Sequence, residues 1–257
     1  MPTKVIVKSW DLSVKAKIEK RAQAVLNEFY DTLQSDRKLL CFFDDQDCQS
    51  FKEQIGQTNR GFFRTLTDGR PLGDDWPNYL REVLHVRMGG CSYEFHEVIY
   101  LHESTCSNPI GLTMTLAHEL QHSVQHGKSP KLFWANHLLT QLDRSIINSL
   151  ELVWCDIPTE FEARIVAKRI SQKLFQTSEV DAFIDEELAK SVNKDEVADL
   201  KCIKEIDTSI AYDDLLGETR KLFQKLTAYE AHFVELLKGD LDLTYVELRA
   251  MLDGNVA

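Results

Sequence analysis

The segment from residue 107 to residue 127 constrains the fold of this chain more than any other, because it combines complete helix signals with an unusual polar pattern. Ser107-Asn108-Pro109 provides a cap followed by proline, a common start for a helix. Gly127 suits the end of one. The spacing therefore predicts a helix over about residues 109–126. Inside it stands the sequence His118-Glu119-Leu120-Gln121-His122.

This sequence predicts part of a metal site. His118 and His122 are four residues apart, so on a helix their side chains lie on the same face, one turn apart. Two imidazoles placed in this way can bind one metal ion, and Glu119 beside them can accept a proton from a metal-bound water. Catalytic zinc keeps three protein ligands and one open position. The motif supplies two ligands, so a third is expected elsewhere.

The alternative interpretation is an ordinary helix with two partly exposed histidines. Apolar side chains line the side nearly opposite the histidines: Leu112, Leu116, Leu120 and Val124. They predict a helix that is buried on one side and presents the histidines on the other. The alternating stretch 93–102 also predicts a strand just before the helix, where an edge strand could align a substrate. Both features favour the metal site.

Apolar periodicity predicts helices over most of the remaining chain. The predicted helices cover about residues 12–34, 79–87, 158–175, 179–192, 195–206, 209–237 and 243–252. A further helix is predicted after the histidine helix, with these apolar positions: Leu138, Leu139, Leu142, Ile146, Ile147 and Leu150. A second short strand is expected over 38–43, whereas glycines and prolines predict mostly loop over 56–78. The predicted fold class is α+β and predominantly helical, with a small sheet before the histidine helix and a helical region towards the C-terminus.

Composition narrows the class of protein. The 257 residues are 43% hydrophobic, enough for one large domain or one domain with an added helical lobe. The net charge of −11 and the lack of a basic run do not favour nucleic acid. No apolar run is long enough to span a bilayer, and residues 1–10 lack the apolar segment of a secretory signal. We therefore expect a cytoplasmic protein with no membrane partner.

The cysteines are scattered and contain no Cys-x-x-Cys pair: Cys41, Cys48, Cys91, Cys106, Cys155 and Cys202. In a chain of this size without a signal peptide, this pattern predicts free intracellular thiols. The alternative is a disulfide or redox role for Cys91 and Cys106, which flank the strand predicted over 93–102.

The histidine helix with a small sheet before it resembles the zincin metallopeptidases. In the metzincin branch, Gly and His would stand where this chain has Gln125 and Lys128. In the gluzincin branch, a later helix carries Glu-x-x-Ala/Ser-Asp, and the run from Glu160 through Ala163 to Arg164 looks similar. The resemblance covers about residues 93–170, extends to minimal gluzincins of the ImmA/IrrE type, and implies that Glu160 is the third zinc ligand.

The chain departs from the gluzincin pattern at Arg164, where gluzincins usually carry an aspartate. That aspartate accepts a hydrogen bond from the outer ring N–H of a ligand histidine. Asp143 and Glu151 are candidates for this task in its place. The departure puts in doubt how the ligand histidines are oriented.

Helical geometry compares Glu160 with the nearby Glu162. The apolar stripe of the predicted helix consists of Ala163, Val166, Ala167, Ile170 and Leu174. At about 100° per residue, Glu160 lies roughly 60° from the centre of this stripe and Glu162 roughly 100° away on its other side. Glu160 is therefore the favoured ligand, and Glu162 stays the alternative. Either residue could instead be an ordinary first-turn acid that the helix dipole favours.

The resemblance implies a zincin-like metallopeptidase domain over residues 1–175 and a helical C-terminal extension over 176–257. It also implies one zinc ion, a protein or peptide substrate, and hydrolysis of peptide bonds with Glu119 as general base. The alternative function is a regulatory or non-catalytic zinc-binding protein. Candidates for the donor that stabilises the oxyanion are Tyr100, His126, His137 and Arg164. The remaining histidines are expected to be structural: His85, His96, His102 and His232.

Overall fold

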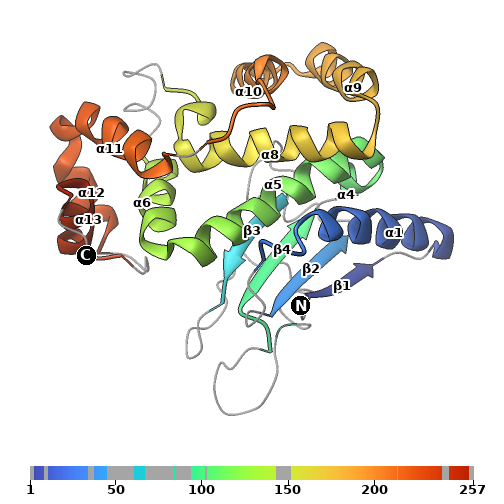
Figure 1. The fold of residues 1–257 in the computed structure, drawn as a ribbon, viewed down its shortest axis with the longest axis horizontal. Helices are drawn as coiled ribbons and strands as arrows, with labels where there is room; N and C mark the ends of the chain where they lie inside the picture. Colours follow the sequence, from blue (N-terminus) through green and yellow to red (C-terminus); the bar gives the residue numbers. More distant parts are fainter. Residues whose placement is uncertain are drawn as a thin grey trace. The chain divides into compact units, whose positions relative to one another are not determined.

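The structure is a computed structural model of the chain (Figure 1). It describes residues 3–8, 11–33, 38–44, 61–66, 84, 94–101, 103–142, 152–212, 214–238 and 243–254. The fold is α+β and mainly helical, as predicted. Two compact units are present: unit 1 contains residues 1–123 and 167–183, and unit 2 contains residues 124–166 and 184–257. The division into 1–175 and 176–257 stays a prediction.

A four-stranded sheet lies in unit 1 (Figure 1). Its strands are β1 (Thr3–Lys8), β2 (Leu39–Asp44), β3 (Gly61–Thr65) and β4 (Glu97–Leu101), in the order β1-β2-β4-β3. The strands β1, β2 and β4 are parallel, and β3 is antiparallel to β4. The strand predicted over 38–43 is confirmed as β2, and the strand predicted over 93–102 is confirmed in part, because β4 covers only Glu97–Leu101 and residues 94–96 precede it. The prediction that 93–102 is an edge strand is wrong, because β4 pairs on both sides.

Strand β3 lies where the sequence predicts mostly loop. A side chain at Gly61 would place its Cβ 2.8 Å from the carbonyl oxygen of Tyr100 on β4. This glycine therefore permits the close approach of two strands, although glycine among other glycines and prolines is typical of a loop. Phe62 stacks on Tyr100 with ring centroids 5.2 Å apart, and Phe63 is buried. The loop prediction is wrong for these five residues.

The other elements of unit 1 are helical. Helix α1 (Leu12–Glu28) begins where the Asp11 carboxylate accepts hydrogen bonds from two backbone N–H groups of its first turn. It ends six residues before the predicted residue 34, although Phe29 and Leu33 remain buried. Helices α4 (Glu103–Cys106) and α5 (Pro109–Lys128) follow β4, and α5 divides after Ser123, so that its last residues belong to unit 2. Asn108 caps α5 by accepting hydrogen bonds from Ile110 and Gly111, as its sequence predicts.

Unit 2 is built from helices around a core of leucine and phenylalanine. They are α6 (Pro130–Thr140), η1 (Trp154–Asp156), α8 (Pro158–Leu174), α10 (Lys194–Glu205), α11 (Leu215–Lys225), η2 (Thr227–Tyr229), α12 (Glu230–Leu236) and α13 (Tyr245–Leu252). The residues from Ala167 in α8 belong to unit 1, and α9 (Thr177–Lys190) divides at Phe183. None of the described helices is long and apolar enough to cross a membrane.

The predicted helices of the second half agree with the structure except at two places. The single helix predicted over 209–237 is wrong, because it begins at Leu215 and is broken by the 3-10 turn η2. Asp214 ends the preceding loop by accepting a hydrogen bond from the N–H of Gly217. The helix predicted from the apolar positions Leu138 to Leu150 corresponds in part to α6, which begins at Pro130 and ends at Thr140. Residues 143–150 and most of the helix predicted over 79–87 lie outside the described residues.

Cys155 of η1 and Cys202 of α10 form a disulfide. The prediction of free thiols is therefore wrong for this pair, because no local spacing links two cysteines that lie on separate helices. Cys41 is a buried free thiol, and burial raises its pKa to about 12. The alternative pairing with Cys91 concerns a residue outside the described part of the chain.

The start of α13 predicts a small pH dependence of stability. The backbone N–H and the hydroxyl of Thr244 both donate to the Glu247 carboxylate, and Lys131 pairs with it. The hydrogen bond from the Thr244 backbone contributes most to lowering the pKa of Glu247 to about 2. Because this pKa is lowered, the stabilisation is present above the usual glutamate pKa and is lost as the pH falls towards 2.

We expect Glu247→Gln to reduce the slope of unfolding free energy against pH between about pH 4.5 and pH 2. The change should be at most about 1 kcal/mol because the carboxylate is exposed. Thermal unfolding at several pH values measures it. An identical slope in wild type and variant would contradict this role for Glu247.

Candidate metal centre

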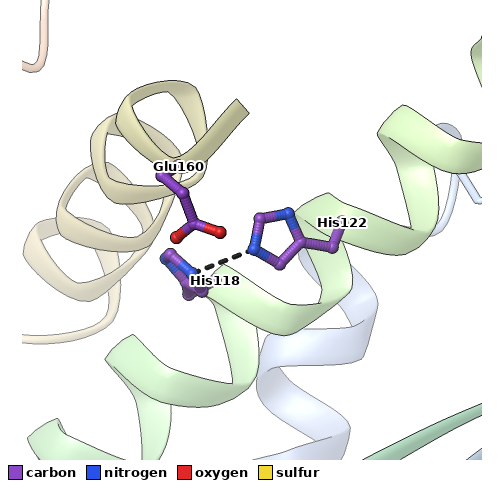
Figure 2. A group of neighbouring side chains, drawn as sticks. All are labelled: His118, His122 and Glu160. Carbon is purple, nitrogen blue, oxygen red and sulfur yellow. Dashed lines mark hydrogen bonds between the residues drawn. The ribbon is translucent and has the colours of Figure 1, made fainter. Parts of the chain in front are cut away.

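The two histidines of the motif converge on one side of α5 (Figure 2). Their Nε2 atoms lie 3.0 Å apart, and the planes of the two rings are nearly perpendicular. Two imidazole nitrogens bound to one tetrahedral zinc at about 2.0–2.1 Å would be separated by ~3.3 Å. The observed separation is therefore within a few tenths of an ångström of the arrangement that a shared ion requires.

Glu160, in the first turn of α8, supplies a carboxylate to the same place (Figure 2). Each of His118, His122 and Glu160 offers one ligand atom, and these atoms all lie within 4.8 Å of one another. His122 and Glu160 are buried, and His118 is partly buried. Two imidazoles and one carboxylate are a donor set that catalytic zinc sites use. These residues therefore form a group that could hold a metal ion.

Gln125 positions the first turn of α8 and also engages Glu162. It follows His122 by three residues on the same helix, and its side-chain amide donates to the carbonyl oxygen of Thr159 at 2.9 Å and to Glu162 at 2.7 Å. The structure thus places the Glu160 carboxylate in the group with the histidines, whereas the Glu162 carboxylate accepts from Gln125. In the sequence, Gln125 stands out only because it replaces the metzincin glycine, and no local pattern predicts its contacts with α8.

We expect Gln125→Leu to lower the free energy of unfolding by about 1–3 kcal/mol, because it leaves the buried Thr159 carbonyl and the Glu162 carboxylate without this donor. Metal affinity should also fall, because the first turn of α8 loses its link to α5. Thermal unfolding and competition with a zinc chelator measure the two effects. Gln23→Leu, on the exposed side of α1, is the matched control and should change neither. Equal behaviour of the two variants would contradict the positioning role.

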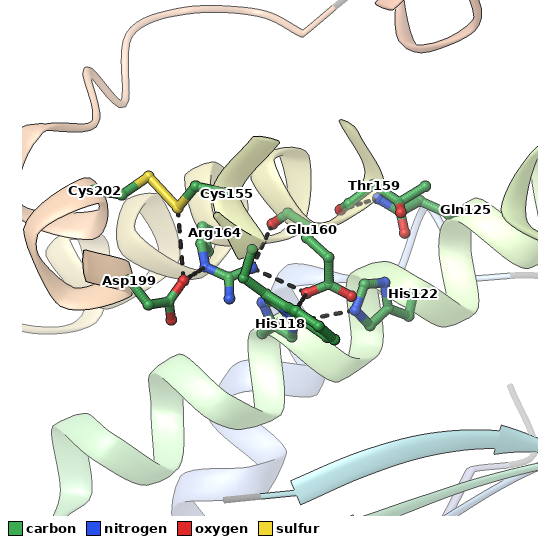
Figure 3. A network of polar contacts seen from close by, with 10 residues as sticks. His118, His122, Gln125, Cys155, Thr159, Glu160, Arg164, Asp199 and Cys202 are labelled. Carbon is green, nitrogen blue, oxygen red and sulfur yellow. Dashed lines mark hydrogen bonds and ion pairs between the residues drawn. A yellow bond between two sulfur atoms is a disulfide. The ribbon is translucent and has the colours of Figure 1, made fainter. Parts of the chain in front are cut away.

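Two donors hold the Glu160 carboxylate through the same oxygen (Figure 3). The indole N–H of Trp154 donates to Oε2 at 2.9 Å, and the guanidinium of Arg164 donates to Oε2 at 3.0 Å. A carboxylate has two oxygens, so donors that fix one of them also fix the direction of the other. Trp154 and Arg164 therefore orient the candidate ligand.

Arg164 is itself held by a second carboxylate. Its Nε donates to Asp199 of α10 at 2.7 Å. Burial alone would lower the pKa of Arg164, but the negative charges of Asp199 and Glu160 raise it more. The buried guanidinium is therefore charged and paired on two sides. The i,i+4 spacing of Glu160 and Arg164 could have predicted their pairing, whereas no local pattern points to Asp199 or Trp154.

Helix α5 is buried on more of its surface than the sequence predicts. Leu112, Leu116, Leu120 and Val124 are buried as predicted, but most of the polar residues from 119 to 126 are buried too. Glu119, next to the first histidine, is 7% exposed. The prediction that only one side of the helix is buried is wrong. A buried carboxylate beside the histidines interacts with charges more strongly than an exposed one would.

The other predicted residues lie in varied places. Tyr100 is fully buried in β4, while His126 and His137 contact the rings of Phe133 and Trp134. The role of an oxyanion donor stays a prediction for these residues and for Arg164. His96 is structural, as expected, because its Nδ1 accepts from the backbone N–H of Lys38 at 2.9 Å. His232 is exposed on α12. Asp143, Glu151, His85 and His102 lie outside the described residues.

The arrangement therefore brings together two imidazole nitrogens, one oriented carboxylate and a neighbouring buried acid. Such a group could hold a metal ion. A comparison of the chain with protein-family models, curated proteins and solved structures found no match.

Proposed function

We propose that this chain is a zinc-dependent metallopeptidase of the gluzincin type. Its one zinc ion is held by His118, His122 and Glu160, and its substrate is a protein or peptide in the cytoplasm. The observation that carries the proposal is that the ligand atoms of these three residues lie within 4.8 Å of one another. The burial of Glu119 beside them supports the catalytic part of the proposal.

A zinc ion held by His118, His122 and Glu160 would supply Lewis acidity, which would lower the pKa of a water molecule and polarise the scissile carbonyl. Glu119 accepts a proton from the attacking water and passes it to the nitrogen of the leaving amine. Its place directly after His118 on a rigid helix keeps the carboxylate close to the ligand group. Trp154 and Arg164 keep the Glu160 carboxylate in a fixed orientation.

The alternative is a regulatory zinc-binding protein without catalysis. A structural metal site needs its ligands and has no use for an additional buried carboxylate next to them. Glu119 is such a residue, and it favours the enzyme.

Comparison of cells that contain wild type or Glu119→Gln tests the proposal. New protein N-termini should appear only with wild type, and both purified proteins should contain one zinc per chain. The same set of N-termini in both cells would refute the assignment of Glu119. Zinc in both proteins without any new N-terminus would favour the regulatory alternative.

A further inference from the structure

The disulfide lies beside Asp199, the residue that holds Arg164 (Figure 3). Cys155 directly follows Trp154 in η1, so the disulfide anchors the turn that presents the indole N–H to Glu160. Cys202 lies on α10, three residues after Asp199. The disulfide therefore connects the turn that carries one donor with the helix that holds the other.

The disulfide is also connected to Glu160 through Asp199 and the guanidinium of Arg164. Asp199 Oδ1 accepts from Arg164 Nε at 2.7 Å, and Arg164 Nη1 donates to Glu160 Oε2 at 3.0 Å. The Sγ of Cys155 lies 3.6 Å from the same Oδ1 atom of Asp199. The sulfur of a disulfide carries no proton, so it does not compete with Arg164 for this oxygen. A thiol in its place can donate to the oxygen, and a thiolate would repel it.

We propose that the Cys155–Cys202 disulfide is a redox switch that controls how tightly the Glu160 site holds its metal. In the disulfide form, η1 and α10 are joined, and Trp154 and Arg164 both hold the Glu160 carboxylate. A dithiol reductant transfers two electrons and two protons to the two sulfurs and is left as a disulfide itself. The two cysteines become thiols, η1 and α10 separate, and metal affinity falls. The inference rests on the proposed zinc site.

The exposure of the two sulfurs suits this role. Cys155 is buried, whereas Cys202 is partly exposed, so a reductant has access to one side of the pair. In a reducing compartment such as the cytoplasm, protein disulfides are usually transient, catalytic or redox-sensing. In such a compartment an oxidant would take two electrons and two protons from the two thiols, and the disulfide that forms would tighten the site.

Zinc affinity of the full chain tests the switch. It is measured by competition with a chromophoric chelator, and the disulfide is quantified by thiol alkylation and mass spectrometry. The oxidised wild type should bind one zinc. Cys155→Ser combined with Cys202→Ser should bind it about 10- to 100-fold more weakly, the loss typical when the partners of a metal ligand are disturbed. Cys41→Ala, which removes a thiol outside the pair, should bind like the oxidised wild type.

Two further measurements keep the test decisive if the double variant fails to fold. Wild type reduced by a phosphine should lose affinity by a similar factor and regain it on reoxidation. Asp199→Asn, with its disulfide intact, should bind zinc more weakly and respond less to reduction. An unchanged response in this variant would overturn the route through Arg164.

Several results would overturn the switch. They are the absence of the disulfide in oxidised protein, equal affinity of the double serine variant, and unchanged affinity of the reduced wild type. Tighter binding with more than one zinc after reduction would show that the thiols are ligands themselves. If oxidised wild type binds no zinc, the proposed function fails as well. If it binds zinc and Glu119→Gln blocks cleavage while redox state has no effect, only the switch fails.

Discussion

His122→Ala should leave the folded protein without its metal. The substitution removes one of three ligands, and the remaining histidine and carboxylate offer only two. The loss of affinity should exceed the loss of about 10- to 100-fold that follows removal of a residue hydrogen-bonded to a metal ligand. Elemental analysis after gel filtration gives the zinc content per chain, and chelator competition gives the affinity. His118→Ala should behave in the same way.

His232→Ala is the matched control, because His232 is an exposed histidine of α12. It should retain the zinc content of wild type. Circular dichroism must show helix content like that of wild type in all three variants, because His122 is buried and its loss leaves a space. A folded His122→Ala protein with full zinc content would refute the candidate metal centre.

Glu119→Gln should retain zinc and lose turnover. Glutamine has nearly the same size as glutamate, so the helix and the two histidines stay in place, but its amide cannot accept the proton of the attacking water. Removal of a general base usually costs about 10²- to 10⁴-fold in rate. The measurement is the cleavage rate of a peptide taken from a site found in the comparison of cell proteomes.

Glu186→Gln provides the control for loss of a negative charge. Glu186 is an exposed residue of α9 that pairs with Lys190, and its substitution should leave the cleavage rate unchanged. Zinc content is measured for both variants, so that loss of catalysis can be separated from loss of metal. Normal cleavage by Glu119→Gln with full zinc content would show that another group accepts the proton.

The sequence predicts correctly those helices whose ends and faces depend on neighbouring residues of the chain. Helices α5 and α8 follow from caps, prolines and apolar spacing, and both begin at the proline that the sequence indicates. Strand β3 was missed because its glycine serves a contact with β4, a strand more than thirty residues away. The break between α11 and α12 was missed because their apolar spacing continues through the 3-10 turn.

The candidate site shows the same limit. The positions of His118 and His122 follow from one helical turn, and the choice of Glu160 over Glu162 followed from the burial expected for α8. The partners of Glu160 depend on tertiary contacts. In the sequence, Arg164 stands where the gluzincin pattern has an aspartate. The structure shows that Arg164 pairs with Glu160 and with Asp199 of another helix. The disulfide joins residues 47 positions apart and left no local signal.

The two compact units are interleaved along the chain, and this has a consequence for how the protein is made. Unit 1 needs residues 167–183, which are synthesised after the first segment of unit 2, and unit 2 needs the C-terminal residues. At about 5–20 residues per second, the ribosome delivers the histidines of α5 several seconds before Glu160. A nascent chain that stops before α8 holds only two of the three ligands. A chain that stops before residue 183 therefore lacks part of both units, and a ligand group made of these three residues assembles only after the ribosome has passed α8.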